Sequence, residues 1–376
     1  MMANHHSRSA LTSLDVALAA LLDGLEPVSP RPEPLDQALG SIAAAMPANL
    51  PAFPLEDTAI IDGWACCALD LVGASGYSPV ALSHAPAWVN AGDAMPRGCD
   101  CVLQADLVDC TTSVALAVGE AAPGQGVRRE GEDMQAHRPP VLEGRTISPA
   151  DLLIARKAGL SQIAVRRPRV RLIDVGAGDR QAASLCFLVE SLLASNASIA
   201  AVDKISCDAL SIAAALASEM CDLLVLLGGT GEGRFDATAE ALRSAGALTA
   251  HRIAVRPGET SAIGRLGSTA VIALAVTPES VLAGYLVFVQ PLLDRLSGRS
   301  HRQGLPMPLA RKIASKVGIS EVVLLAREKD MWMPLAVGTF PLEAIRLAEA
   351  WLIVPDDCEG YDAETVVAAM PLRNIN

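Results

Sequence analysis

The residues with the clearest chemical meaning are four glycines that follow one apolar run. Asp222 to Asp236 reads Asp-Leu-Leu-Val-Leu-Leu-Gly-Gly-Thr-Gly-Glu-Gly-Arg-Phe-Asp, so the glycines fall within six residues. The apolar run predicts a buried strand, and a helix-like pattern begins at Ala237. Between a strand and a helix, glycine-rich backbone presents N–H groups to an anion, and the helix dipole adds positive charge. The segment predicts a phosphate-binding loop; its alternative is a plain tight connection.

This loop differs from two well-known phosphate-binding signatures. It lacks the Gly-Lys-Ser/Thr ending of a P-loop, so no lysine follows to contact terminal phosphates. A second glycine-bearing segment, Arg171 to Asp179, also follows a strand pattern. There, Gln181 occupies the position at which a dinucleotide-binding loop has a small residue. These departures argue against a nucleoside triphosphatase and against a nicotinamide-dependent dehydrogenase.

Three aspartates stand where a carboxylate can take part in chemistry. Asp179 and Asp236 each end a glycine-rich loop after a strand, at the edge where open α/β sheets bind ligands. Two carboxylates beside a phosphate suit Mg²⁺, and the alternative is a pair of helix N-caps. Asp62 lies in the apolar context Ile-Ile-Asp-Gly-Trp, where a desolvated carboxylate needs a partner. Its alternative is an Asp-Gly turn.

One arginine follows another strand-like run. Arg256-Pro-Gly comes after Ile253-Ala-Val and can supply a cation to an oxyanion, although Glu259 beside it weakens that interpretation. A solvated turn is the alternative. The segment Thr277-Pro278-Glu279 has the threonine cap, proline and acidic first turn of a helix start. That segment needs no function to explain it.

The composition limits the classes of protein to consider. The chain has 376 residues, enough for two or more domains, and is 51% hydrophobic, which excludes a disordered chain. Only 3% of residues are aromatic, so stacking platforms for single-stranded nucleic acid are not expected. A formal net charge of −12 argues against any general nucleic-acid binder. A small anionic ligand remains compatible, because backbone amides act locally.

Cysteine, histidine and hydropathy patterns argue against a structural metal and a membrane. The nine cysteines include no Cys-x-x-Cys pair and predict buried free thiols, and the six histidines never fall at zinc-ligand spacing. No apolar stretch reaches the roughly 18 residues that a membrane-spanning helix needs. Asp15 interrupts the first apolar segment, so no signal peptide is expected. We therefore expect a cytoplasmic protein.

The elements that must position these residues fall into two patterns. The first half has helical spacing in Leu14 to Leu25 and Leu35 to Ala45, short β-like runs from about Pro51 to Pro140, and a capped helix over Ser148 to Ala158. The second half alternates strands and helices, which predicts a parallel sheet covered by helices. From about residue 304, short strands predict a small β-barrel or sandwich. The strands expected in the alternating part span 170–175, 197–202, 223–227 and 270–276.

In this order, four motifs resemble those of the molybdopterin molybdenumtransferases, the MoeA-type proteins related to the E domain of gephyrin. Asp57 to Ala65 is similar to the family's Ser-Ala-Met-Asp-Gly-Tyr-Ala, and Ala91 to Val102 to its Thr-Gly-Ala-x-x-Pro-x-Gly-x-Asp-x-Val. Arg129 to Asp133 matches Arg-x-Gly-Glu-Asp, and Asp222 to Asp236 stands at its Ser-Gly-Gly-Val-Ser-x-Gly loop. The resemblance covers nearly the whole chain.

The resemblance implies a multidomain α/β fold and an elongated, four-part subunit. It implies a discontinuous N-terminal helical domain (1–50 and 140–168), a β-rich inserted domain (51–139), a MogA-like molybdopterin-binding α/β domain with a parallel sheet (169–302) and a C-terminal β-barrel domain (303–376). It also implies a homodimer whose cleft uses both chains, with a MogA-type protein or an apo-molybdoenzyme as further partner. Neither nucleic acid nor membrane is expected as a partner.

The family's reaction inserts molybdate into adenylylated molybdopterin with a divalent cation, here Mg²⁺, and releases AMP. Carried over by position, Asp62, Asp179 and Asp236 would be catalytic, and Asp179 and Asp236 would assist the metal. The resemblance places the pterin's terminal phosphate on the glycine loop and an anion-binding cation at Arg256. The cofactor-binding residues implied are Gly228, Gly229, Thr230, Gly231, Gly233, Arg256 and Pro278.

Several positions depart from the family pattern. The family's Gly-Asp-Glu is Gly178-Asp-Arg180 here, its Lys-Pro-Gly-Lys is Arg256-Pro-Gly-Glu259, and its Pro-Gly-Asn-Pro is Ala275-Val-Thr-Pro278. Ala91 stands where the family has threonine. Glutamate in place of lysine repels an oxyanion, a change of roughly several kcal/mol in a partly desolvated site. The sequence therefore leaves a second hypothesis open: a non-catalytic protein that binds or delivers molybdopterin or the finished cofactor.

Overall fold

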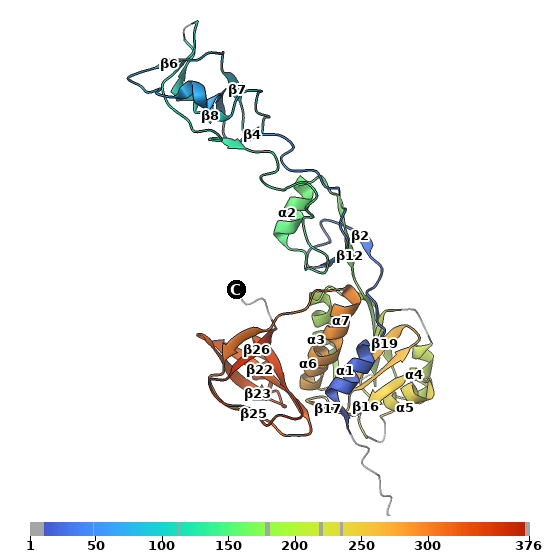
Figure 1. The fold of residues 1–376 in the computed structure, drawn as a ribbon. Helices are drawn as coiled ribbons and strands as arrows, with labels where there is room; N and C mark the ends of the chain where they lie inside the picture. The colour runs from blue at the N-terminus through green and yellow to red at the C-terminus, as the bar shows by residue number, and fades with distance from the viewer. Residues whose placement is uncertain are drawn as a thin grey trace, which may run out of the picture.

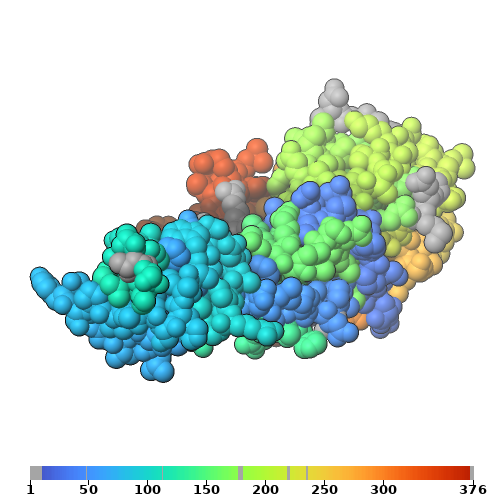
Figure 2. Space-filling view, turned by 90° about the horizontal axis from the view of Figure 1, so that it is seen from above, coloured from blue at the N-terminus to red at the C-terminus, as the bar shows by residue number. Residues whose placement is uncertain are grey.

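The computed structural model describes residues 11–372 except 48, 112, 177–180, 218–220 and 234–235. The described chain is elongated, with a β-rich module at one end, a middle unit, and a broad end that contains an α/β unit and a C-terminal sheet (Figure 1). A view from above shows the same separation, since the cyan module and the yellow-green α/β unit lie at opposite ends of that face (Figure 2). The domain boundaries expected from the sequence stay a prediction.

The β-rich module consists of short strands in three small sheets. Its central strand β5 (Gly63–Cys66) pairs on both sides, and the sheets have the orders β7-β5-β8, β6-β10-β9 and β11-β4. Trp64 and Trp88 pack edge to face across β5 and β7, with ring centroids 5.1 Å apart. The other strands are β4 (Thr58–Ala59), β6 (Val80–Ala81), β7 (Ala87–Val89), β8 (Cys101–Leu103), β9 (Val108–Asp109), β10 (Leu116–Ala117) and β11 (Val127–Arg128).

The middle unit holds one helix against a three-stranded sheet, β2 (Arg31–Pro34), β12 (Gln162–Arg166) and β3 (Ile42–Ala43). Helix α2 (Pro149–Lys157) has Ser148 as N-cap, as the sequence predicted, and the structure adds a capping box between Ser148 and Asp151. The predicted helix over Leu35 to Ala45 is wrong. Gly40 adopts φ 75°, which ends regular helix, and the residues after it form β3, whose pairing with β12 replaces helical hydrogen bonds.

The α/β unit contains a six-stranded sheet of order β14-β13-β15-β19-β18-β16. The first four strands are parallel, which confirms the predicted parallel sheet there, whereas β18 and β16 are antiparallel at one edge. The turn at Gly267 joins β18 directly to β19, so no helix covers that edge connection. The strands are β13 (Arg169–Val175), β14 (Ser198–Ile205), β15 (Leu223–Leu227), β16 (Leu248–His251), β18 (Ala262–Leu266) and β19 (Thr269–Leu274).

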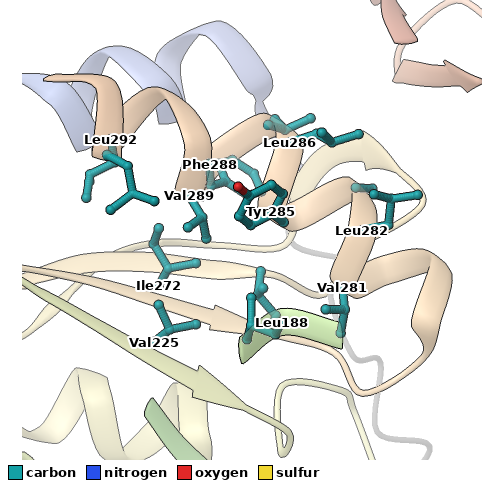
Figure 3. Packing of buried hydrophobic residues seen from close by; sticks show 14 of the residues in the cluster. Leu188, Val225, Ile272, Val281, Leu282, Tyr285, Leu286, Phe288, Val289 and Leu292 are labelled. Atoms are coloured by element: carbon teal, nitrogen blue, oxygen red, sulfur yellow. The ribbon is translucent and has the colours of Figure 1, made fainter. Parts of the chain in front are cut away.

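Helices bury both faces of this sheet. On one face Leu188, Val225, Ile272 and Phe288 belong to the largest core cluster (Figure 3). Leu224 and Leu226 point to the opposite cluster with α4 and α5. The helices are α1 (Leu14–Leu22), α3 (Ala182–Ala194), α4 (Ala209–Leu216), α5 (Thr238–Ser244), α6 (Pro278–Gly284), a π-helical turn (Tyr285–Val289) and α7 (Gln290–Ser297). Within the described ranges, no helix has both the length and the apolar character to cross a membrane.

The C-terminal sheet recruits two strands from distant parts of the chain. Its order is β1-β17-β22-β24-β26-β20, with β23 paired to β22, and this path leaves an open half-barrel. Strand β17 (Ile253–Arg256) comes from the α/β unit and β1 (Thr12–Ser13) from the N-terminal segment. The remaining elements are β20 (Leu305–Pro308), β21 (Ile313–Ala314), β22 (Ser320–Glu328), β23 (Met331–Val337), α8 (Leu342–Leu347), β24 (Ala350–Val354), β25 (Gly360–Tyr361) and β26 (Val366–Pro371).

The β-rich module provides a direct test of its strand packing. A Cβ at Gly63 would lie 2.1 Å from the Leu103 carbonyl oxygen, whereas a Cβ at Gly76 would meet nothing within 4 Å. We expect Gly63→Ala to destabilise the module by about 1–3 kcal/mol, because β5 and β8 must separate. Gly76→Ala should leave the stability unchanged. Urea unfolding followed by the fluorescence of the four tryptophans, of which Trp64 and Trp88 lie in this module, checks this, and equal midpoints for both variants would contradict the strand contact.

Candidate functional site

The candidate site lies at the point where the connections of the α/β sheet diverge. Strands β13 and β15 are neighbours, but the chain leaves β13 toward β14 and leaves β15 toward β19 on the other side. Open sheets form a ligand crevice at such a switch point, beyond the carboxyl ends of the strands. The loop after β13 includes Asp179, which lies outside the described residues. Its predicted role stays a prediction, and the geometry below comes from the loop after β15.

Close packing explains the first two glycines of the loop. Gly228 has φ 113° and Gly229 has φ 65°, a region that favours glycine. A Cβ at Gly228 would lie 2.4 Å from the Val175 carbonyl oxygen. Thr238 closes the loop, because its hydroxyl donates to the Gly228 carbonyl at 2.8 Å and its N–H donates to the Gly229 carbonyl at 3.0 Å. These glycines therefore set the shape of the loop before any ligand is considered.

Asp236 shapes the end of the same loop. Its carboxylate accepts a hydrogen bond from the Gly233 N–H at 2.8 Å, and a Cβ at Gly231 would lie 2.6 Å from the same carboxylate oxygen. The alternative of a helix N-cap is not what the structure shows, because Ala237 holds that position and no side chain caps α5. Since α5 has only 7 residues, its dipole adds little. Any phosphate here depends on loop N–H groups beside an exposed carboxylate.

The middle of the loop is tied to the segment around β17. Thr230 is buried, its hydroxyl lies 3.2 Å from that of Thr260, and its carbonyl oxygen lies 2.9 Å from Nε2 of His251. An ion pair of 2.8 Å joins Glu232 to Arg252. His251 and Thr260 were not singled out from the sequence, and no local pattern marks them. Both residues contact the loop because the chain around β17 folds back against it.

Arg256 lies on this segment and is already paired. Its guanidinium donates to the Glu259 carboxylate at 2.8 and 2.5 Å, and it lies 3.8 Å from Glu321. The turn after Arg256 approaches the start of α6, since a Cβ at Gly258 would be 3.9 Å from the Ser280 carbonyl. Exposed Pro278 opens that helix. The glycine loop and Pro278 follow the neighbouring parallel strands β15 and β19, whereas Arg256 lies on β17 of the C-terminal sheet, where two carboxylates offset its charge.

Asp62 belongs to a separate group in the β-rich module. Its exposed carboxylate accepts from the Ala91 N–H at 2.7 Å, and the Asp57 carboxylate accepts from the Glu130 N–H at 2.8 Å. Three of the four sequence motifs thus meet in one place. That place adjoins β4, at the opposite end of the molecule from β15 and α5 in both views (Figures 1 and 2). One chain does not bring Asp62 to the glycine loop.

A buried carboxylate in β13 was missed from the sequence. Asp174 is 2% exposed and accepts a short hydrogen bond from the Gln181 amide, which also donates to the Val175 carbonyl at 3.2 Å. This pair ties the end of β13 to the first turn of α3. The available signal was an acidic residue within the apolar end Leu-Ile-Asp-Val of the strand. Gln181, which departs from the dinucleotide-binding pattern, therefore has a structural role: it binds Asp174 and the Val175 carbonyl.

The two buried cysteines are poor nucleophiles, and the cysteines form no metal cluster in the described part of the chain. All nine are free, but only Cys66 and Cys101 are fully buried, so the expected burial holds for a minority. Burial raises the pKa of the Cys66 thiol to about 11 and that of Cys101 to about 12, which keeps both protonated at neutral pH. No group of three or more His, Cys, Asp or Glu side chains able to hold a metal occurs in the described part of the chain.

Two family models match this chain in succession. Residues 12–159 match the MoeA N-terminal region (domain I and II), and residues 169–295 match a probable molybdopterin binding domain. Together they cover most of the chain and include both groups of residues described above. The chain belongs to the MoeA-type molybdopterin molybdenumtransferase family.

Curated relatives and solved structures agree with this family. The chain is 26% identical over 318 residues to molybdopterin molybdenumtransferase 2 of Mycobacterium tuberculosis, covering 72% of this chain and 78% of that protein. It is 26% identical over 368 residues to the molybdopterin molybdenumtransferase of Synechococcus elongatus, covering 87% and 90%. A molybdopterin biosynthesis MoeA protein from Pyrococcus horikoshii has the same fold, with TM-score 0.77, 23% identity, and coverage of 97% and 100%.

The Thr238 contact gives a test of the loop geometry. Thr238→Val keeps the shape but removes the donor to the buried Gly228 carbonyl, so we expect a loss of about 1–2 kcal/mol in the free energy of unfolding. Thr238→Ser keeps the hydroxyl and serves as the matched control. Chemical unfolding followed by circular dichroism checks this. A valine variant as stable as the wild type would show that the hydroxyl does not hold the loop.

Proposed function

We propose that this chain is a molybdopterin molybdenumtransferase that inserts molybdate into adenylylated molybdopterin and releases AMP. The carrying observation is the glycine loop at the switch point of the α/β sheet, with Asp236 bound to its own Gly233 N–H. The relatives above are named for this activity, and the chain aligns with most of their length. The loop supplies backbone donors for a phosphate, and the aspartate supplies a carboxylate beside it.

In this proposal the loop holds the terminal phosphate of the pterin. Gly228 and Gly229 fix the turn, Thr230 anchors it to Thr260, and the N–H groups between Gly231 and Gly233 face the anion. Arg256 and Pro278 complete the proposed binding residues. Because Asp236 uses the Gly233 N–H, an arriving phosphate competes with this carboxylate. Displacement of the carboxylate would free it for a cation.

Mg²⁺ fits Asp236 as one carboxylate ligand. This ion keeps several waters and is bound in proteins by one or two carboxylates together with substrate phosphates, so a dedicated cage is not required. Asp236 is exposed at the loop, and Asp179 is the proposed second carboxylate. When bound, Mg²⁺ would offset the negative charge of the phosphates. Asp236 would orient the adenylylated end, and the loop donors would hold it still.

A homodimer would bring Asp62 to this loop. Within one chain the two groups of residues lie at opposite ends, so the proposed catalytic set is complete only if the β-rich module of one protomer reaches the α/β unit of its partner (Figure 1). We further propose that the enzyme acts in the cytoplasm. A MogA-type protein would supply the adenylylated pterin, and an apo-molybdoenzyme would accept the product.

A second function is favoured by the state of Arg256. The two carboxylates around its guanidinium leave little net positive charge for molybdate at this position. A protein that binds molybdopterin or finished cofactor and delivers it, without catalysis, would need the loop but not this cation. The glycine loop fits both functions. The release of AMP separates them.

The first experiment measures AMP release from adenylylated molybdopterin with Mg²⁺ and molybdate. We expect molybdate-dependent release, and a loss of about 100-fold or more in kcat for Asp236→Asn, because the amide still accepts from Gly233 but lacks the charge. Glu240→Gln, an exposed change on α5, is the matched control and should keep full activity. Tight pterin binding without any AMP release would contradict the enzymatic function and support the delivery function.

Mixing inactive variants tests the shared site. Asp62→Asn and Asp236→Asn should each be inactive as purified homodimers. In a mixed dimer one site carries both changes and the other carries neither, so about half of the activity per mixed dimer should return. The measurement is AMP release after co-expression and purification of the doubly tagged dimer. A doubly tagged dimer as inactive as its parents would place Asp62 outside the partner's site.

A further inference from the structure

A second cleft, of 680 Å³, lies where three parts of the chain meet. Phe187 of α3 and Tyr285 of the π-helical turn form one wall, Gly40 and Thr146 of the middle unit form another, and Leu372 after β26 closes the third side. No described residue of the glycine loop lines it. Its volume is in the range of pockets for small organic ligands. The proposed pterin reaction makes no use of it.

The cleft has an excess of positive charge in an acidic protein. Of the residues that the structure describes, Arg299 and Arg302 line it and no aspartate or glutamate does. Both arginines share one carboxylate behind the wall: Asp294 lies 3.1 Å from Nε of Arg299 and accepts from Arg302 at 2.5 and 2.9 Å. Burial and the neighbouring Arg302 lower the pKa of Arg299. One carboxylate between two cations leaves a net charge of one, within a chain of net charge −12.

Polar and apolar parts of the cleft are arranged for an amphipathic ligand. The Tyr285 hydroxyl donates to the Ser191 carbonyl at 3.1 Å and forms a short hydrogen bond with Ser195, so this polar wall is held in place. Phe187, Leu286 and Ile345 supply apolar surface. Guanidinium groups match the planar or tetrahedral oxygen sets of carboxylates and phosphates. The lining therefore fits an acid group on an apolar body.

We propose that this cleft is a second ligand site, which binds a small organic anion with a phosphate or carboxylate group directed at Arg299 and Arg302. The site also includes hydrogen bonds that connect the α/β unit to the middle unit. Arg299 donates to the Thr146 hydroxyl at 2.8 Å, and Ser300 N–H donates to the Gly144 carbonyl at 2.8 Å beside it. An anion on Arg299 therefore binds at the connection that carries the β-rich module.

The test uses phenyl phosphate, benzoate and inorganic phosphate as probes in isothermal titration calorimetry. We expect saturable binding of at least one aromatic acid, weakening as salt is added. Stronger binding of phenyl phosphate than of benzoate would assign phosphate esters as the ligand class, and the reverse order would assign carboxylates. Inorganic phosphate alone should bind more weakly than phenyl phosphate, because it lacks the apolar body.

Two pairs of variants locate the binding. Ala194 is an exposed lining residue at the end of α3, so Ala194→Glu should fold normally and repel the probe, while Ala194→Gln, of equal size, should bind as wild type. Arg302→Gln should weaken binding roughly ten- to hundredfold, and Arg311→Gln, an exposed arginine outside the cleft, should not. Absence of saturable binding of both aromatic probes at millimolar concentration overturns the proposal. So does equal affinity of wild type, Ala194→Glu and Arg302→Gln.

Discussion

Backbone contact at the switch point is the constraint on which the candidate site depends. The loop after β15 passes so close to the end of β13 that a Cβ at Gly228 would lie 2.4 Å from the Val175 carbonyl oxygen. Only glycine allows that approach, and the approach fixes where the following N–H groups lie. Thr238 and Asp236 then hold the two ends of the loop by hydrogen bonds of 2.8 Å. A preformed loop of this kind loses little conformational freedom when it binds a ligand.

Local signals in the sequence predicted local structure well. Helix α2 was predicted because Ser148 and Pro149 are adjacent and specify its start, and β15 was predicted because its five residues form an unbroken apolar run. The helix predicted for Leu35 to Ala45 was wrong because part of this segment pairs as a strand with β12, which lies more than a hundred residues later. Strand β17 joins the C-terminal sheet for the same kind of reason, since its partner β22 is distant in sequence. The spacing of apolar residues within either segment does not indicate which distant strand it pairs with.

The candidate site divides in the same way. The glycines and Asp236 could be found because they are adjacent in the sequence, and the resemblance located Asp62. Of the two carboxylates near Arg256, Glu259 could be predicted from the sequence because it is three residues away. Glu321 could not, because it approaches Arg256 only through the pairing of β17 with β22. The separation of Asp62 from the loop is a property of the elongated fold (Figure 1). Thr260 and His251 carry no sequence signal, since each acts through a contact with Thr230.

The protein places two kinds of anion-binding chemistry in different surroundings, and Arg256 shows why. A guanidinium near carboxylates pairs with them, and Arg256 is held by Glu259 and Glu321 in this way. Backbone N–H groups carry only partial charge, so the loop can stand beside Asp236 and still bind a phosphate, once the phosphate displaces the carboxylate from the Gly233 N–H. That makes the glycine loop compatible with a carboxylate that must also meet a cation. In the second cleft Arg299 and Arg302 share the carboxylate of Asp294, so two cations face one acid and a net positive charge is left to attract an anion.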